Sequence, residues 1–297
     1  MRTGVTRFAW ATLAFNVVVI LMGATVRATG SGAGCGRSWP TCQGEVVPTL
    51  EGSTAVEFAH RAVSGVALVV VAILAWWVFR AVPKGNQARA GAVASAIAIV
   101  GEALIGAAIV LFEWVADDAS VARAVAVPLH LVNTFFLLAA LALTAHWLGG
   151  GPTVRRSDHP RTWRWVVAGA VSLLVIAGTG AITALADTLF PRGGSGEDVE
   201  HFLTDLRVVH PIVAVTVVVV AWIAVSRRGL EGREVTFMAV LVGLQMVSGL
   251  LVITLGLPLW MRLIHLALAD MVWVSYVIIS ARLLAGRPVP GLAQSNA

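Results

Sequence analysis

The chain has 297 residues, of which 58% are apolar and 12% are charged, and its net charge is +5. A soluble globular protein carries about 25% charged residues, so this composition excludes the soluble class and predicts an integral membrane protein. In a soluble chain the basic excess would suggest a nucleic-acid partner. Here the basic residues fall in short loops between apolar runs, where they set orientation in the membrane, so we expect no nucleic-acid binding.

Eight apolar runs are long enough to cross a bilayer, which takes about 20 helical residues per crossing. They cover residues 8–28, 56–79, 90–112, 125–148, 163–187, 207–226, 234–255 and 260–284. The predicted fold class is therefore an all-α membrane protein with eight transmembrane helices, surrounded by membrane lipid. The first run is predicted to be a retained helix, because Gly32 stands where a lipoprotein cleavage site needs a branched apolar residue.

The positions of the basic residues predict how the helices are oriented. Of the 21 Lys and Arg residues, 14 fall on the side that holds both termini: Arg2, Arg7, Arg80, Lys84, Arg89, Arg155, Arg156, Arg161, Arg164, Arg227, Arg228, Arg233, Arg282 and Arg287. Basic loops stay in the cytoplasm. Both termini are therefore predicted to be cytoplasmic, in a bacterial cytoplasmic membrane, with the first connecting loop outside.

That first outer loop contains the only two cysteines, Cys35 and Cys42, in "CGRSWPTC". A disulfide between them would persist on the oxidising outer face of the membrane, and it would stabilise the fold by roughly 2.5 kcal/mol in the chain-entropy model. Two free thiols and a transient redox pair are the alternatives. The sequence does not distinguish a structural disulfide from a redox-active one.

The two halves of the chain repeat the same series of motifs in the same order. Three segments of the first half, 57–70, 101–110 and 127–141, align with 207–220, 244–253 and 262–276 of the second. This pattern predicts two pseudo-symmetric four-helix bundles, residues 1–150 and 151–297. Because each unit has an even number of crossings, the repeats are expected to be related by an axis along the membrane normal.

Four histidines lie four to six residues into the even-numbered runs: His60, His130, His210 and His265. All even runs cross the membrane in the same direction, so these imidazoles are predicted to share one layer near the outer surface. Ionisable side chains inside a membrane are costly and usually serve a function. Three further histidines receive ordinary structural interpretations: His146, His159 and His201.

Pairs of imidazoles without added carboxylates or thiolates favour haem iron over zinc. Zinc usually takes three or four protein ligands, whereas haem iron takes two axial ligands on opposite faces of a flat macrocycle that fits between helices. The sequence therefore predicts two bis-histidine haem sites, one formed by His60 with His130 and the other by His210 with His265.

The residues one helical turn before the histidines differ between the halves. Arg207 and Arg262 stand three positions before His210 and His265, so they share a helix face with the ligands and are predicted to contact haem propionates. Arginines that merely reach toward lipid headgroups are the alternative.

In the first half this position belongs to Glu57, three residues before His60 and four before Arg61. A carboxylate would repel a propionate, so Glu57 is predicted to be catalytic, either moving a proton or stabilising positive charge on the substrate. The alternative is a structural pair of Glu57 with Arg61 or with the outer loop. Arg61 is also a candidate propionate contact.

These motifs together resemble the heme A synthase family over essentially the whole chain. The resemblance rests on "GATVRATGSGAGCGRSWPTC" (23–42), "EFAHR" (57–61), the histidine pairs and the repeat. It implies an oxidoreductase that converts the C8 methyl group of heme O to the formyl group of heme A for cytochrome oxidases. It further implies that His60 and His130 bind the substrate heme O.

The resemblance also assigns roles to the remaining site residues. His210 and His265 would hold a heme b that relays electrons, Glu57 would be the catalytic glutamate, and Cys35 and Cys42 would form a disulfide. Its partners would be heme O and heme A, the enzyme that produces heme O, and cytochrome oxidase assembly factors. The sequence does not indicate the electron acceptor.

Two other classes of protein fit the histidine pattern. A dihaem cytochrome b-like electron-transfer subunit would hold two equivalent haems, and a haem transporter or chaperone would exchange one of them. The difference between Glu57 in the first half and Arg207 in the second favours the enzyme.

Two acidic residues inside apolar runs stand outside this assignment. Glu102 lies where the second half has Gln245 and where the family is expected to have an amide. We predict that it forms a hydrogen bond between helices, with a proton route to the first haem site as the alternative. Asp270, five residues after His265, is also predicted to form an interhelical hydrogen bond.

Overall fold

A computed structural model describes residues 2–154, 160–191, 201–227 and 232–285. This part of the chain contains helices and no strand, and eight of its helices are long and apolar enough to cross a membrane. The eight are α1 (Arg2–Ala28), α2 (Gly52–Ala81), α3 (Gln87–Leu111), α4 (Val121–Leu148), α5 (Pro160–Leu189), α7 (Val209–Arg227), α8 (Arg233–Thr254) and α9 (Leu259–Leu284). The predicted all-helical membrane fold is confirmed.

Short polar residues set where several of these helices begin. The side chain of Asn86 accepts a hydrogen bond from Ala88 N at the start of α3, and that of Ser120 accepts one from Arg123 N at the start of α4. His201, which received no ligand role, caps the short α6 (Phe202–Asp205) by accepting from Leu203 N. Each cap satisfies a backbone donor that the first turn leaves without a partner.

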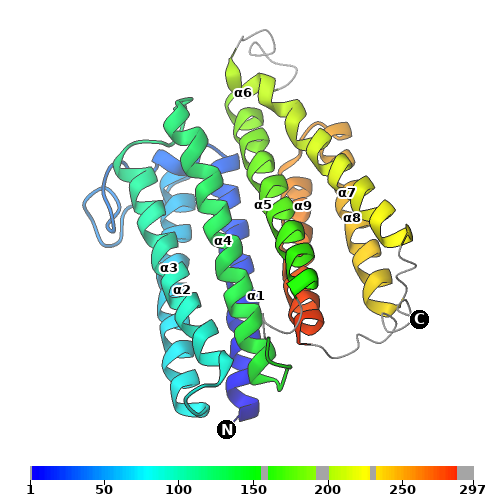
Figure 1. Cartoon of the computed structure of the whole chain (residues 1–297). Helices are drawn as coiled ribbons and strands as arrows, with labels where there is room; N and C mark the ends of the chain where they lie inside the picture. The colour runs from blue at the N-terminus through cyan, green and yellow to red at the C-terminus, as the bar shows by residue number, and fades with distance from the viewer. Residues whose placement is uncertain (1, 155–159, 192–200, 228–231, 286–297) are drawn as a thin grey trace.

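The helices form two neighbouring groups (Figure 1). In the first, α1 lies against α2 and α4, and α3 lies against α2 and α4. In the second, α8 lies against α9, and α5 lies against α7 and α9. The groups meet where α4 contacts α5 and α9. The pseudo-symmetry of the two bundles and their division at residue 150 stay predictions.

The apolar core lies mainly inside the first group and extends to α9. Val71, Leu74, Leu138 and Leu141 are fully buried between α1, α2, α3 and α4. Trp273 of α9 joins this core, and its indole N–H donates to the carbonyl oxygen of Phe135 at 2.6 Å. One apolar cluster therefore fixes α9 against the first group.

The helix ends alternate between two ends of the molecule. α1 and α2 approach each other at the end that holds Cys35 and Cys42, which we call the disulfide end, and the first residues of α1 and the last of α9 lie at the opposite end (Figure 1). The sides of the membrane remain predictions. Five residues of the orientation and histidine arguments lie outside the described residues: Arg155, Arg156, His159, Arg228 and Arg287.

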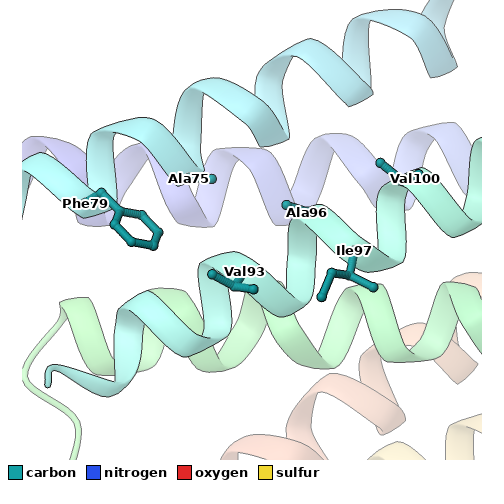
Figure 2. A pocket seen from close by; sticks show the side chains of 6 residues that line it. All are labelled: Ala75, Phe79, Val93, Ala96, Ile97 and Val100. Carbon is teal, nitrogen blue, oxygen red and sulfur yellow. The ribbon is translucent and has the colours of Figure 1, made fainter. Parts of the chain in front are cut away.

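A shallow apolar groove lies between α2 and α3, toward the end away from the disulfide (Figure 2). It is lined by Ala75, Phe79, Val93, Ala96, Ile97 and Val100. Several of these side chains are exposed in the way expected of a surface that faces lipid. The groove contains none of the predicted site residues, and we assign it no role in the chemistry.

The two acidic residues inside apolar helices have different outcomes. Glu102 accepts hydrogen bonds from Asn133 and Thr134 of α4, so the predicted interhelical bond is confirmed. The prediction for Asp270 is wrong: it is 1% exposed, and neither carboxyl oxygen has a hydrogen-bond partner among the described residues. Trp273, three residues further along α9, does not supply the missing donor, because its indole N–H donates to the carbonyl oxygen of Phe135.

Candidate functional site

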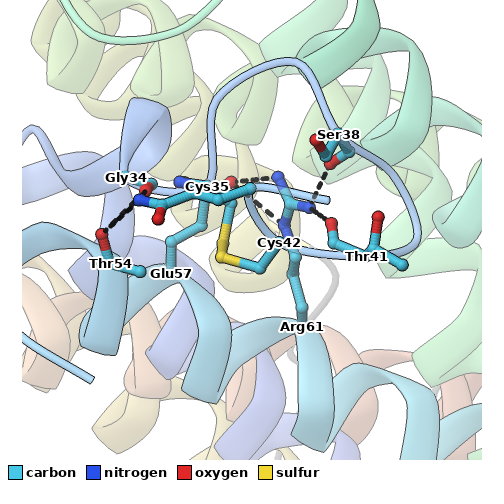
Figure 3. The surroundings of a disulfide bond; sticks show 9 residues. Gly34, Cys35, Ser38, Thr41, Cys42, Thr54, Glu57 and Arg61 are labelled. Carbon is cyan, nitrogen blue, oxygen red and sulfur yellow. Dashed lines mark hydrogen bonds and ion pairs between the residues drawn. A yellow bond between two sulfur atoms is a disulfide. The ribbon is translucent and has the colours of Figure 1, made fainter. Parts of the chain in front are cut away.

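The loop after α1 is closed by the predicted disulfide between Cys35 and Cys42 (Figure 3). Gln43 and Thr54 both donate to the carbonyl oxygen of Gly34, at 2.9 and 2.8 Å, which ties the loop to the first turn of α2. A Cβ atom at Gly34 would lie 2.5 Å from the backbone of Ser53, so only glycine allows this close approach.

Glu57 is 3% exposed and holds this loop from beneath (Figure 3). Its Oε2 accepts a hydrogen bond from Cys35 N at 2.8 Å, and its Oε1 accepts from Nε and Nη2 of Arg61 at 3.1 and 2.5 Å. Both structural alternatives for Glu57, the pair with Arg61 and the outer-loop partner, are therefore present. The carboxylate is fixed, with both oxygens engaged.

Arg61 completes the same network. Its Nη1 donates to the carbonyl oxygens of Ser38 and Thr41, at 2.5 and 2.7 Å. With the two hydrogen bonds to Glu57, these contacts use four of the five guanidinium N–H groups. One donor is left for a haem propionate, so the contacts of Arg61 fit loop attachment better than ligand binding.

Three of the four candidate ligand histidines rest against a glycine of a neighbouring helix. A Cβ atom at Gly23 of α1 would lie 2.9 Å from Cε1 of His60, and one at Gly180 of α5 would lie 3.0 Å from Cε1 of His210. Gly249 of α8 stands in the same relation to His265, also at 3.0 Å. The missing side chains let each imidazole lie close to the adjoining backbone.

The second-half histidines face each other. The ring centroids of His210 and His265 are 6.4 Å apart, and the ring planes are inclined by 82°. Two imidazoles that bind one metal from opposite sides, through bonds of about 2 Å, have centroids roughly 6 to 6.5 Å apart. The separation therefore fits coordination of a single iron between the two rings.

The Nδ1 atoms of this pair are held by the protein. His210 Nδ1 lies 3.1 Å from the carbonyl oxygen of Ile176, and His265 Nδ1 lies 2.9 Å from Oγ of Ser248. When Nδ1–H is fixed by an acceptor, Nε2 carries the lone pair that binds a metal. Gln245 Nε2 is 3.4 Å from Nε2 of His265.

The first-half histidines interact electrostatically. His130 and Glu102 are within electrostatic range of His60. Nδ1 of His130 is 3.0 Å from Oε2 of Glu102, a contact that the sequence did not predict, although the N–H is not aligned for a hydrogen bond. His60 Nδ1 is buried and has no hydrogen-bond partner among the described residues.

The donor set fits haem better than a metal held by protein alone. Within the described ranges, no group of three His, Cys, Asp or Glu side chains could hold a metal ion. A bis-histidine haem needs only two such side chains, because the porphyrin supplies the other ligands. All four imidazoles are partly buried, and none is fully exposed to the surroundings.

Arg207 and Arg262, the predicted propionate contacts, have different surroundings. Nε of Arg207 pairs with Oδ1 of Asp187 at 3.0 Å, and its Nη2 donates to the carbonyl oxygens of Ala186, at 2.7 Å, and Phe190. Arg207 thus fastens the start of α7 to the last turn of α5. Nε of Arg262 is buried and has no hydrogen-bond partner among the described residues.

Arg27 is a candidate that the sequence argument missed. It lies in the last turn of α1, and its Nη1 is buried without a hydrogen-bond partner in the described part of the chain. Arg262, Arg123 and Asp187 are within electrostatic range of it. Arg27 lies within "GATVRATG", one of the segments that resemble heme A synthase, and this could have marked it as a site residue. A lone arginine at a helix end, however, is usually interpreted as reaching toward lipid headgroups.

Comparison with known proteins identifies the family. The model of the cytochrome oxidase assembly protein family, COX15-CtaA, matches residues 6–277. The chain belongs to this family. Relatives named heme A synthase include one from Lysinibacillus sphaericus, 25% identical over 284 residues, which are 90% of this chain and 91% of that protein. The predicted resemblance to heme A synthase is confirmed.

Other relatives are matched over smaller shares of their own length. A heme A synthase from Alkalihalophilus pseudofirmus is 42% identical over 97 residues, which are 32% of this chain and 33% of that protein. A protein from Thermus thermophilus named protoheme IX farnesyltransferase is 45% identical over 291 residues, which are 93% of this chain but 48% of that protein. The chain thus spans about half the length of this relative.

Proposed function

We propose that the chain converts the C8 methyl group of heme O to the formyl group of heme A. The observation that carries the proposal is the arrangement of two histidine pairs, with the rings of His210 and His265 separated by 6.4 Å, in a member of the COX15-CtaA family. The acidic network at Glu57 beside only the first pair supports a division into a substrate site and a cofactor site.

In this proposal His210 and His265 hold a heme b, and His60 and His130 hold the substrate. The bound heme b supplies one-electron transfer. Adding one water oxygen to a methyl carbon and forming a formyl group releases four electrons and four protons, which must leave toward an acceptor outside the described chain. The contacts of Nδ1 with Ile176 and Ser248 orient the ligand imidazoles of the second site.

Glu57 acts beside the substrate in this account. It lies one turn from His60 on α2, which puts both side chains on the same helix face. Its two oxygens accept hydrogen bonds from Cys35 and Arg61, so accepting a proton would disturb existing bonds. These contacts favour the second of the two predicted roles, stabilisation of positive charge that develops at the methyl carbon.

Arg27 and Arg262 are proposed to bind the carboxylates of a haem. Both have buried guanidinium nitrogens without a hydrogen-bond partner among the described residues, and they approach each other from α1 and α9. Two nearby cations repel each other, and an anion in addition to Asp187, which is within electrostatic range of Arg27, would stabilise them. Haem propionates supply that negative charge and accept charge-assisted hydrogen bonds.

Replacing Arg27 by glutamine should weaken haem retention by about tenfold to a hundredfold, because a hydrogen bond to a charged group contributes about 1.5–3 kcal/mol. The measurement is the haem-to-protein ratio after repeated washing with a haem-binding competitor. The matched control is Arg37→Gln, since Arg37 is an exposed arginine at the same end, 3.6 Å from Glu113. Equal retention in both variants would show that Arg27 has no contact with the haem.

Replacing Gly180 by alanine should displace the ring of His210, whose Cε1 would lie 3.0 Å from the new Cβ. A side chain forced off its rotamer costs about 0.5–1.5 kcal/mol, so haem affinity should fall about twofold to tenfold. The control is Gly106→Ala, because a Cβ there meets nothing within 4 Å. Haem titration of both variants followed by absorbance tests this, and an unchanged affinity for Gly180→Ala would count against the glycine contact.

The proposed activity is tested in a bacterial host that makes heme O but no heme A. The chain is expressed there, and the extracted pigments are separated by chromatography and identified by mass. Heme A is expected with the wild-type chain and not with His60→Ala. A folded, haem-loaded wild-type protein that yields no heme A would refute the activity and leave the dihaem electron-transfer subunit or the haem carrier as the function.

We also propose a place and a partner for this activity. Of the 16 basic residues in the described part of the chain, 10 belong to helix ends and loops away from the disulfide, which favours a cytoplasmic location for both termini and an outer location for the cysteine loop. In Thermus thermophilus a segment similar to this chain forms about half of a protein named protoheme IX farnesyltransferase. That covalent association supports a partnership with the enzyme that supplies heme O.

A further inference from the structure

Glu102 is fixed beside one ligand histidine by several contacts from α4. Its Oε1 accepts a hydrogen bond from Nδ2 of Asn133 at 2.6 Å, and its Oε2 lies 3.1 Å from the hydroxyl of Thr134 and 3.0 Å from Nδ1 of His130. Asn133 is itself held by donating to the carbonyl oxygen of Ala98 at 2.9 Å. The carboxyl group is therefore positioned at the ring nitrogen of His130 that is not needed for iron.

The second half has only neutral groups in the corresponding places. Gln245 occupies the repeat position of Glu102. Nδ1 of His265 faces the hydroxyl of Ser248, which donates its own hydrogen to the carbonyl oxygen of Gln245 at 2.8 Å. His210 faces the backbone carbonyl of Ile176. Of the four imidazoles, only that of His130 has a carboxyl oxygen of the described residues at hydrogen-bond distance from Nδ1.

This difference changes how strongly an imidazole donates electrons to iron. The Nδ1–H of His130 is not aligned for a hydrogen bond to Glu102, so the carboxylate acts by its charge. At 3.0 Å from Nδ1 it makes the imidazole more basic and a stronger donor through Nε2 than a neighbouring hydroxyl or carbonyl does. Stronger donation stabilises the oxidised metal and lowers the reduction potential of the site. The two sites would then differ in potential although each has two histidine ligands.

We propose that Glu102, acting through His130, gives the first-half haem a lower reduction potential than the second-half haem. Electrons released at the substrate then move from the first site to the second rather than back. This inference rests on the proposed function, since it takes the two histidine pairs as haem sites. Glu102 is a positioning residue in this scheme, because it contacts the ligand and not the reacting carbon.

The test is a redox titration of the purified full-length chain, with each haem followed by its own absorbance change. The single variants His60→Ala and His265→Ala assign the two potentials by removing one haem each. Glu102→Gln should raise the first potential by the equivalent of at least a tenfold change in the reduction equilibrium, about 59 mV for one electron. The potential of the second haem should stay unchanged and serves as the internal control.

A second variant, Ser248→Asp, keeps the proposal testable if Glu102→Gln fails to load the first haem. Ser248 Oγ lies 2.9 Å from Nδ1 of His265, so an aspartate there places a carboxylate beside that nitrogen and should lower the second potential while leaving the first unchanged. A first potential that does not move in a haem-loaded Glu102→Gln protein overturns the proposal. If Glu102→Gln loads no haem, an unmoved second potential in a haem-loaded Ser248→Asp protein overturns it. A wild-type chain that retains no haem at His60 and His130 would instead refute the proposed function.

Discussion

Replacing His265 by alanine is expected to remove the firmly held haem of the second half. Loss of one of two axial ligands should weaken retention by more than about a hundredfold, since even the residues that merely orient a metal ligand contribute about tenfold to a hundredfold. His210 would then face no second ring at 6.4 Å. The measurement is the haem-to-protein ratio of the purified chain, together with its reduced-minus-oxidised spectrum.

The control for this variant is His201→Ala. His201 lies in the same half, but its ring caps α6 through Leu203 N and belongs to neither pair. Haem content should be close to that of the wild type. Full haem retention in a folded His265→Ala protein would show that another group ligates the iron, and the assignment of His210 and His265 would then be wrong.

Replacing Glu57 by glutamine is expected to lower the rate of heme A formation by about 10²- to 10⁴-fold, the usual contribution of a group that handles charge or protons at a reacting atom. Glutamine keeps the size of the side chain and can still accept a hydrogen bond from Cys35 N. The substrate haem should therefore remain bound. The measurement is heme A yield per bound substrate haem in the host that makes heme O only.

The control variant Arg61→Gln distinguishes a catalytic role of Glu57 from its role in attaching the disulfide loop. Arg61 makes the loop contacts to Ser38 and Thr41 and the ion pair with Glu57. Its replacement loosens the same network but leaves the carboxylate in place. We expect a loss of about tenfold or less. Equal losses of heme A yield in Glu57→Gln and Arg61→Gln would show that Glu57 serves only to hold the disulfide loop. Its contacts with Cys35 and Arg61 are consistent with that role.

The fold was predictable because hydropathy and charge act along the chain. Each of the eight apolar runs contains a helix. Most of these helices begin a few residues before the predicted start, at polar caps such as Asn86 and Ser120 in α3 and α4, whereas α7 begins two residues after it. The proximity of His210 and His265 could be anticipated because equal depth in parallel helices requires only counting residues. The proximity of Cys35 and Cys42 followed from their separation by seven positions.

Contacts that depend on the rotation of helices were not predictable. Glu102 and His130 belong to α3 and α4, and the sequence does not specify which faces of these helices meet. The meeting of Arg27 with Arg262 likewise depends on how α1 lies against α9. Asp270 was assigned a partner because buried carboxyl groups usually have one, yet it has no hydrogen bond among the described residues.

The two pairs of histidines differ in their surroundings more than in their ligands. Glu57, Arg61 and the disulfide loop stand beside the first pair, whereas Arg207 with Asp187 stands beside the second. In our proposal, the first haem site therefore adjoins a network suited to chemistry, and the second adjoins a structural ion pair. This asymmetry is what separates an enzyme from a symmetric dihaem carrier in our account.

The central claim, that the four histidines bind two haem irons in pairs, is tested most directly by electron paramagnetic resonance of the oxidised, haem-loaded chain. Six-coordinate low-spin signals from two haems are expected in the wild type. His60→Ala or His130→Ala should abolish one signal, and His210→Ala or His265→Ala should abolish the other. Survival of both low-spin signals in the double variant His60→Ala and His265→Ala would contradict the claim.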